Sequence, residues 1–234
     1  MPHDTSAIAD VTASGSTVHF EGTKTILLVG VGGQGTILAG NILAMTAAEA
    51  GLDVKVSEIH GMSQRGGSVS PVIRVGEHVE SMIADPGCAD VVVAFEAVEA
   101  LRAQQFLREG GTMFVNDEQI VPVSVHVGGF TMPTDVHERL DKIGAVMIPA
   151  GEIARAAGSP RSTNVVLVGA LSTALPFTQE EWKDAIAKRV PAHTVDANLE
   201  AFDRGRAAAQ ASVWHKRMAV PTARADRPHL ADWG

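Results

Sequence analysis

The sequence is poor in the residues that bind redox metals. It contains one cysteine, Cys88, among 234 residues. A single thiol cannot form an internal disulfide, and it cannot hold an iron–sulfur cluster, which needs about four thiolate ligands. Cys88 follows Asp85-Pro86-Gly87, a turn-like stretch, so we interpret it as an unreactive thiol rather than a nucleophile. The lack of disulfides is typical of a reducing compartment, and we expect a cytoplasmic protein.

Aromatic residues and clustered positive charge are also scarce. The chain has no tyrosine, aromatic residues make up 4% of it, and the formal net charge is −8. The core must therefore be built from Val, Ile, Leu, Ala and Met. An acidic chain without a long Lys/Arg cluster is a poor match for nucleic acids or anionic membranes. No apolar run reaches the ~20 residues of a membrane helix, and the N-terminus lacks a secretory pattern, so we expect neither a nucleic-acid nor a membrane partner.

Strand and helix patterns alternate along most of the chain. Residues 1–23 are rich in Ser, Thr, Ala and Gly, and we predict a mobile N-terminal tail there. We predict one domain over residues 24–212 and a C-terminal tail over residues 213–234. Continuous or alternating apolar runs predict strands over residues 25–31, 52–57, 89–95, 112–116 and 146–149. Helical periodicity predicts helices over residues 37–50, 96–108, 151–157, 164–174, 180–189 and 194–211.

Two glycine-marked segments refine the predicted topology. Residues 69–75 and 79–83 flank Gly76-Glu77-His78 and predict a β-hairpin inserted in the sheet. Gly110-Gly111 is predicted to end the helix that starts at Glu96. Together the elements predict an α/β fold, with a Rossmann-like, mostly parallel sheet, helices on both of its faces and a helical C-terminal extension.

A glycine-rich turn joins the first predicted strand to the first predicted helix. Gly30, Gly32 and Gly35 have the G-x-G-x-x-G spacing, and Gly33 and Gln34 lie between the last two. Such glycines allow a tight turn and the close approach of a phosphate, and the helix N-terminus that follows offers free N–H groups. The spacing leaves two interpretations open: a phosphate-binding site, or a turn that only connects the strand to the helix.

A second loop is dense in residue types that bind ligands. Ser63, Gln64, Arg65, Gly66 and Gly67 combine a guanidinium suited to phosphate or carboxylate with neutral donors and an accessible backbone. We predict this loop at the carboxyl end of the sheet, where open α/β folds bind ligands. It is either a ligand-binding or partner-binding loop, or a flexible surface loop with a solvated arginine.

Three acidic residues near these loops have separate interpretations. Glu58 follows the second predicted strand, where dinucleotide-binding proteins place a ribose partner, so a nicotinamide or flavin site is one hypothesis. Glu96 and Glu99 fall in the first turn of a predicted helix, and we interpret them as capping residues. The sequence shows no zinc-binding, serine-hydrolase or P-loop pattern, so we expect no metal site and assign no catalytic residue.

A family resemblance is carried by residues 30–35, 57–67, 94–102 and 164–171, supported by Asn198, Phe202 and Gly205. These segments are similar to the β subunit of indolepyruvate ferredoxin oxidoreductase, which corresponds to the γ domain of the 2-oxoacid:ferredoxin oxidoreductases. The resemblance covers about residues 24–212. The loop over residues 30–35 resembles all γ domains, whereas the loop over residues 63–67 resembles the indolepyruvate branch.

The resemblance implies a shared reaction in a larger assembly. A 2-oxoacid such as indolepyruvate is oxidatively decarboxylated to its acyl-coenzyme A, and electrons pass to ferredoxin. Thiamine diphosphate, Mg²⁺ and the [4Fe-4S] clusters are expected on a larger α subunit, and this chain is expected to hold no cofactor alone. The resemblance also implies a heterodimer doubled into a heterotetramer or a higher assembly.

Coenzyme A is the expected co-substrate, and the loop over residues 30–35 and Arg65 are candidate contacts for its phosphates. Two alternative functions are also compatible with the sequence. One is a stand-alone NAD(P)- or flavin-dependent oxidoreductase, and the other is a non-catalytic scaffold in which both loops serve only as interface.

Overall fold

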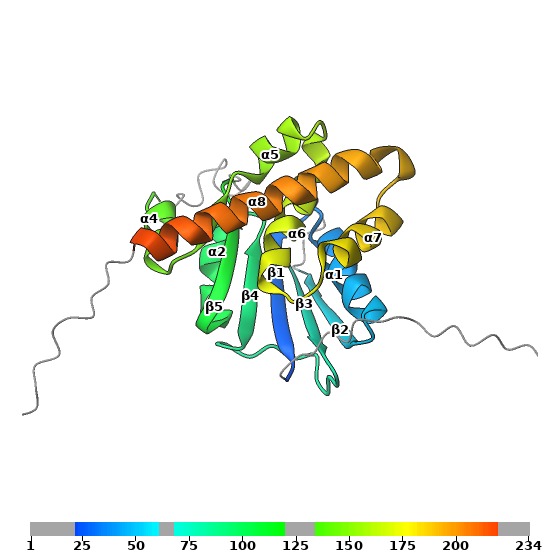
Figure 1. Ribbon diagram of the computed structural model, residues 1–234. Coiled ribbons are helices and arrows are strands. Elements are labelled where there is room, and N and C mark those ends of the chain that lie inside the picture. The colour runs from blue at the N-terminus through cyan, green and yellow to red at the C-terminus, as the bar shows by residue number, and fades with distance from the viewer. Residues whose placement is uncertain (1–21, 61–67, 120–133, 220–234) are drawn as a thin grey trace, which may run out of the picture.

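A single six-stranded sheet organises the fold (Figure 1). The structure, a computed structural model, describes residues 22–60, 68–119 and 134–219. The strands are β1 Lys24–Val31, β2 Asp53–His60, β3 Ser68–Gly76, β4 Ala89–Ala94, β5 Leu107–Asn116 and β6 Val146–Ile148. Their order is β2-β3-β1-β4-β5-β6. Strands β1, β4, β5 and β6 run parallel, and β3 is antiparallel to both of its neighbours, which confirms the predicted mostly parallel sheet.

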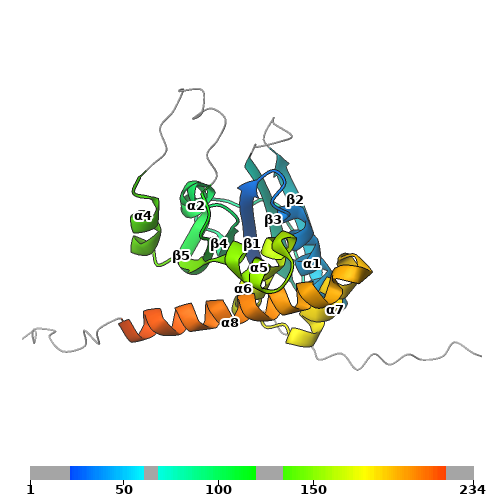
Figure 2. The same ribbon diagram turned by 90° about the horizontal axis from the view of Figure 1, so that it is seen from above.

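Helices cover the two faces of the sheet unequally. One face carries α1 Thr36–Glu49, α5 Ala150–Ala156, α6 Thr163–Leu171, α7 Gln179–Arg189 and α8 Val195–Ala219. The other carries α2 Ala97–Ala103 and α4 Val136–Lys142. Figure 2 shows the sheet between these two layers. Short 3-10 helices lie at Gln104–Phe106 (η1), Pro160–Ser162 (η2), Ser172–Ala174 (η3) and Ala192–Thr194 (η4).

The sequence of β1 explains why both faces are covered. Successive side chains of a strand point to opposite faces. Ile26 and Leu28 belong to the core beneath α1, whereas Leu27 and Val29 belong to the core beneath α2. All four side chains are buried, so the continuous apolar run predicts a strand that is enclosed from both sides.

The predicted β-hairpin pairs differently from the expectation. Residues 68–76 form strand β3, but residues 79–83 form no strand. The physical reason is that β3 pairs with β1 on one side and with β2 on the other, so neither of its edges remains for a further strand. Arg74 instead holds the later segment, donating from Nη1 to the carbonyls of Ser81 (3.0 Å) and Ile83 (3.3 Å). The antiparallel pair is therefore β2 with β3.

Two predicted boundaries also differ from the structure. Gly110 and Gly111 do not end a helix, because α2 and η1 end before Leu107, which already belongs to β5. The pairing of β4 with β5 shifts register between Ala89 and Val91, and Gly110 accommodates this bulge with a φ of 73°. Helix α8 continues to Ala219, past the predicted domain end at residue 212. Residues 1–21 and 220–234 of the predicted tails lie outside the described residues.

Helices α6 and α8 cross at very close range. A Cβ atom on Gly169 of α6 would lie 2.1 Å from the Phe202 carbonyl oxygen, and one on Gly205 of α8 would lie 2.0 Å from the Val166 carbonyl oxygen. Only a hydrogen atom fits at either position. The contact helps to enclose α6, in which every residue from Asn164 to Leu171 is buried.

Helix α7 begins with a capping box that gives a stability prediction. Thr178 Oγ1 accepts a hydrogen bond from the Glu181 backbone N–H (3.3 Å), and Glu181 Oε2 accepts one from the Thr178 N–H (2.7 Å). We expect Thr178→Ala to lower the free energy of unfolding by about 1 kcal/mol. The melting temperature should then fall by about 2–4 °C. Thr178→Ser keeps the hydroxyl and should melt like the wild type; an equal loss in both variants would show that the cap is not responsible.

Candidate functional site

The connections change sides of the sheet between β1 and β4. The chain leaves β1 for α1 on one face, and it leaves β4 for α2 on the other. Strands β1 and β4 are parallel neighbours, so their carboxyl ends mark the topological switch point at which open α/β folds have a crevice. In open α/β sheets this is the usual place for a ligand. The glycine-rich turn over residues 30–35 lies on one side of the crevice, and the start of α2 lies on the other.

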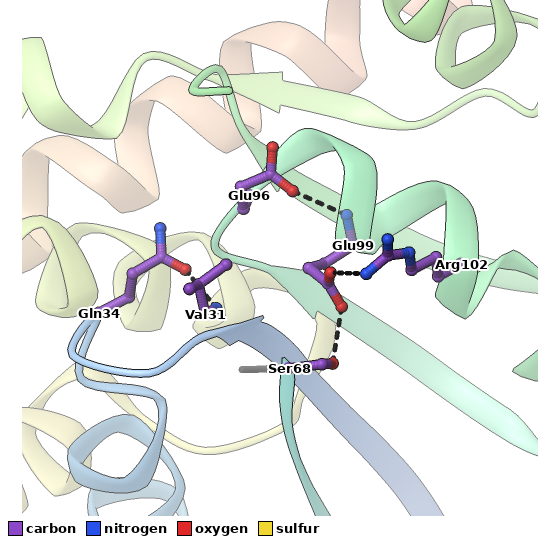
Figure 3. A network of polar contacts seen from close by, with 6 residues as sticks. All are labelled: Val31, Gln34, Ser68, Glu96, Glu99 and Arg102. Atoms are coloured by element: carbon purple, nitrogen blue, oxygen red, sulfur yellow. Dashed lines mark hydrogen bonds and ion pairs between the residues drawn. The ribbon is translucent and has the colours of Figure 1, made fainter. Parts of the chain in front are cut away.

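The side chain of Gln34 fixes the glycine-rich turn from within. Its Oε1 accepts a hydrogen bond from the Val31 N–H (2.7 Å), and its Nε2 donates to the Phe95 carbonyl (2.9 Å). The first bond holds the turn in shape, as Figure 3 shows. The second crosses from the β1 connection to the β4 connection. Both ends of the amide are thus used inside the protein, which makes Gln34 a residue that positions the turn.

The glycines of this turn have different surroundings. A Cβ on Gly30 would lie 2.8 Å from Gln34 Oε1 and 2.9 Å from the Cβ of Phe95, so this glycine permits close packing. Gly35 caps α1 with a φ of 82°, and a Cβ there would lie 2.6 Å from Asn164 Nδ2. Gly33 is exposed, and a Cβ on it would meet nothing within 4 Å. The turn is therefore packed on its inner side and open at Gly33.

A buried asparagine extends the network across the crevice. Asn116 ends β5 and is 1% exposed. Its Nδ2 donates to the Phe95 carbonyl (3.2 Å) and to Glu118 Oε2 (2.9 Å), and its Oδ1 accepts from the Ala150 N–H (3.2 Å). The Phe95 carbonyl thus joins Gln34 and Asn116, and it ties together the carboxyl ends of β1, β4 and β5. The sequence signal for Asn116 is a polar residue that ends a buried strand.

The start of α2 holds a second polar network, shown in Figure 3. Glu96 is the N-cap residue and accepts from the Glu99 N–H (2.8 Å), which confirms its predicted capping role. Glu99 does more than the capping interpretation allows. Its buried carboxylate accepts from Ser68 Oγ (2.7 Å) and pairs with the Arg102 guanidinium. This carboxylate connects α2 to the first residue of β3, a contact that the sequence analysis missed.

A groove of about 560 Å³ lies beside this network on the α2 face of the sheet. Its lining includes Leu27 and Val29 of β1, Val72 of β3, and the serines Ser57, Ser68 and Ser70 of β2 and β3. Helix α2 forms one wall with Glu99 and Arg102, and residues 82–84 contribute to the lining opposite. The groove therefore combines apolar side chains and serine hydroxyls with a charged wall on α2.

The second predicted loop can be placed only by its flanks. Ser63, Gln64, Arg65, Gly66 and Gly67 lie outside the described residues. Strand β2 leads into the segment and β3 leaves it at Ser68. Ser68 pairs with Val31 at the end of β1, and His60 pairs with Val69, so both described flanks lie at the carboxyl end of the sheet.

The position of Glu58 counts against a dinucleotide site. Glu58 lies in β2 opposite Pro71 of β3, and β3 separates β2 from β1. With strands about 4.8 Å apart, β2 lies about 10 Å from β1, one strand further than a dinucleotide fold places it. The carboxylate is therefore displaced from a ligand seated on the glycine-rich turn.

Neither Cys88 nor the described acidic and histidine residues form a redox or metal centre. Burial raises the pKa of the Cys88 thiol, although the Arg74 charge partly opposes this. A raised pKa lowers the thiolate fraction, which supports the interpretation of an unreactive thiol. Across residues 22–60, 68–119 and 134–219, no group of three or more His, Cys, Asp or Glu residues could hold a metal ion. In the same ranges, no helix has the length and apolar character needed to cross a bilayer.

Comparisons with known proteins agree on one family. Residues 25–208 match the family described as pyruvate ferredoxin/flavodoxin oxidoreductase. The chain is 44% identical over 192 residues to the indolepyruvate oxidoreductase subunit IorB of Thermococcus kodakarensis, a match covering 79% of this chain and 95% of that protein.

Solved structures share the fold. The γ subunit of a keto/oxoacid ferredoxin oxidoreductase from Geobacter sulfurreducens has a TM-score of 0.62 at 24% identity, covering 82% of this chain and 99% of that one. A 2-oxoglutarate:ferredoxin oxidoreductase from Magnetococcus marinus was solved with 2-oxoglutarate, coenzyme A and succinyl-CoA bound. It has a TM-score of 0.63 at 26% identity, covering 82% of this chain and 32% of that longer chain.

Proposed function

The chain belongs to the pyruvate ferredoxin/flavodoxin oxidoreductase family, and we propose that it is the small γ-type subunit of an indolepyruvate-type 2-oxoacid:ferredoxin oxidoreductase. The observation that carries this proposal is the 44% identity to an indolepyruvate oxidoreductase subunit over nearly that subunit's whole length. The complete enzyme would convert an arylpyruvate and coenzyme A to an acyl-coenzyme A and CO₂, and would pass two electrons to ferredoxin.

The residues of this chain do not fit the redox cofactors of that reaction. One cysteine cannot ligate a [4Fe-4S] cluster, and the described residues offer no metal cluster for the Mg²⁺ of thiamine diphosphate. We therefore assign these groups to a larger α subunit. Thiamine diphosphate, bound there, would supply the electron sink for decarboxylation. The expected assembly is a heterodimer doubled into a heterotetramer or a higher assembly.

The glycine-rich turn fits a different task, the binding of coenzyme A phosphates. Gly33 is exposed beside the N-terminus of α1, a 14-residue helix whose free N–H groups and dipole favour an anion. Gln34 and Phe95 hold the inner side of the turn, so its open side has a fixed shape. The related Magnetococcus structure contains coenzyme A, which supports this choice of ligand. Arg65, in the neighbouring loop, would add a positive charge.

A substitution of Arg65 tests this assignment. In the complex of this chain with its larger subunit, Arg65→Ala should raise the KM for coenzyme A about 5- to 10-fold, because a charge-assisted hydrogen bond contributes about 1.5 kcal/mol or somewhat less. The KM for the 2-oxoacid should change little. Steady-state reduction of a dye or ferredoxin measures both.

The matched control is Arg189→Ala, which removes an exposed arginine at the end of α7. A scaffold role would give a different pattern. In that case Arg65→Ala would weaken assembly and leave the KM for coenzyme A of the assembled enzyme unchanged.

A further inference from the structure

One buried side chain beside the glycine-rich turn has an unused hydrogen-bond donor. Asn164 lies in the first turn of α6 and is 7% exposed. Its Oδ1 accepts a hydrogen bond from the Val165 N–H (3.0 Å), and this bond identifies which end of the amide is the oxygen. The other end is the Nδ2 donor, from which no described residue accepts a hydrogen bond. Buried amides normally use their donors, so we expect a partner from outside the described residues.

The unused donor lies against the N-terminus of α1, the helix that packs beside α6 on the same face of the sheet (Figure 1). A Cβ on Gly35, the N-cap residue of α1, would lie 2.6 Å from Asn164 Nδ2, so the amide fills the space beside this glycine. Nδ2 is not among the fully enclosed unpaired atoms of the described residues, so solvent or a ligand reaches it. This end of α1 is open as well, because Gly33 is exposed and Ile37 is 42% exposed.

The first turn of α1 adds further unused donors at the same place. Its N-cap residue has no side chain, and the N–H groups of Thr36, Ile37 and Leu38 receive no cap within the described residues. Thr36 is 4% exposed, and its hydroxyl has no hydrogen-bond partner among those residues either. Neutral donors of α1 and of α6 therefore lie together beside Gly35.

We propose that Asn164 binds the pyrophosphate of coenzyme A at this place, an inference that rests on the proposed function. Nδ2 donates to one phosphate oxygen, and the N–H groups in the first turn of α1 donate to others. The dipole of α1 favours the negative charge. The buried amide thus obtains the partner that the described residues do not supply, and Asn164 becomes a ligand-binding residue on a helix far from the glycine-rich turn in sequence.

The chemistry of the donors favours the pyrophosphate over the 3′-phosphate of coenzyme A. A phosphate monoester carries a charge of about −1.5 to −2 at pH 7, and arginine or lysine matches it best. Each phosphorus of the pyrophosphate diester carries only one negative charge. Backbone N–H groups at the start of a helix are the usual partners of such a group. The donors beside Gly35 are all neutral, which fits the smaller charge.

Two substitutions of Asn164 test this contact in the assembled complex of the chain with its larger subunit. Asn164→Ala removes the donor, and we expect the Kd for coenzyme A, measured by titration calorimetry, to rise about 10-fold. Asn164→Asp keeps the acceptor for the Val165 N–H but places a carboxylate against the phosphate, so the Kd should rise about 100-fold. Dephospho-coenzyme A, which lacks the 3′-phosphate, should lose affinity by the same factors.

The matched control is Asn198→Ala. Asn198 is another buried asparagine near the start of a helix, α8, but its Nδ2 already donates to the Thr194 carbonyl (2.8 Å). The Kd for coenzyme A should be that of the wild type in this variant, even if the melting temperature falls. If Asn164→Asp does not assemble, the alanine variant and the two ligands still decide.

The possible outcomes separate this inference from the proposed function. An equal loss for both ligands in the Asn164 variants, with the control unchanged, supports the pyrophosphate contact. If these variants bind coenzyme A like the wild type, the contact is wrong, and the proposed function stands as long as the complex oxidises 2-oxoacids. A loss for coenzyme A alone would place the 3′-phosphate beside Gly35 and overturn the pyrophosphate assignment. If the wild-type complex does not bind coenzyme A, both proposals fail.

Discussion

Replacing Gly205 by alanine should lower the free energy of unfolding by about 3 kcal/mol, because the new methyl group collides with backbone rather than with a movable side chain. Its Cβ would lie 2.0 Å from the Val166 carbonyl oxygen, so α6 and α8 must move apart. Alanine favours a helix by about 1 kcal/mol over glycine, which is too little to offset the collision. The melting temperature should fall by about 6–12 °C, as measured by calorimetry or circular dichroism.

Two further variants make this prediction specific. Gly151→Ala in α5 adds the same methyl group where the nearest heavy atom is 3.9 Å away, so its stability should be unchanged or slightly higher. Gly169→Ala collides at the same crossing, 2.1 Å from the Phe202 carbonyl. The double variant Gly169→Ala/Gly205→Ala should lose less stability than the sum of the losses in the two single variants. Once one methyl group has pushed α6 and α8 apart, the second already has room. Strict additivity would contradict a shared crossing.

Replacing Gln34 by alanine should lower kcat/KM for coenzyme A about 10- to 100-fold in the assembled enzyme. Small displacements of a binding loop have effects of this size. The substitution removes the acceptor for the Val31 N–H and the donor to the Phe95 carbonyl, so the turn loses its link to the β4 connection. We expect most of the loss as a higher KM for coenzyme A. The KM for the 2-oxoacid should change less.

Two variants separate this positioning role from general damage. Gln34→Glu keeps an acceptor for the Val31 N–H but places a carboxylate oxygen against the Phe95 carbonyl, so it should not rescue the KM. Gln210→Ala removes an exposed amide on α8 and should leave every kinetic constant unchanged. An unchanged KM for coenzyme A in Gln34→Ala would show that the glycine-rich turn is not part of the coenzyme A site.

The path from β1 to α1 is predictable from sequence because its determinants are local. An apolar run, a cluster of glycines and a helical periodicity follow one another without interruption. Expected bounds of 25–31 and 37–50 compare with Lys24–Val31 and Thr36–Glu49 in the structure. The position of β3 is not local. Residues 79–83 alternate like a strand, but a strand needs a free edge, and β1 and β2 already occupy both edges of β3.

The candidate site also contains features that follow from local sequence and contacts between residues far apart in sequence. The glycine-rich turn is visible in the sequence, and its place at the crevice follows once β4 is recognised as the parallel neighbour of β1. The role of Glu99 is hidden, because Ser68 comes from a strand 31 residues away in sequence. Only the i, i+3 spacing of Glu99 and Arg102 hints at a pair. That residues 63–67 bind coenzyme A stays a prediction, which the Arg65→Ala variant tests.

The insertion of β3 beside β1 has a consequence for the nascent chain. Both sheet neighbours of β1 follow it in the sequence, and the earlier of them, β3, ends about 45 residues after β1. At a synthesis rate of about 5–20 residues per second, the ribosome needs about 2–9 s to extend the chain that far. During that interval the apolar strand has been made but has no strand to pair with. Translation speed therefore sets how long the first strand stays vulnerable to chaperone capture and aggregation.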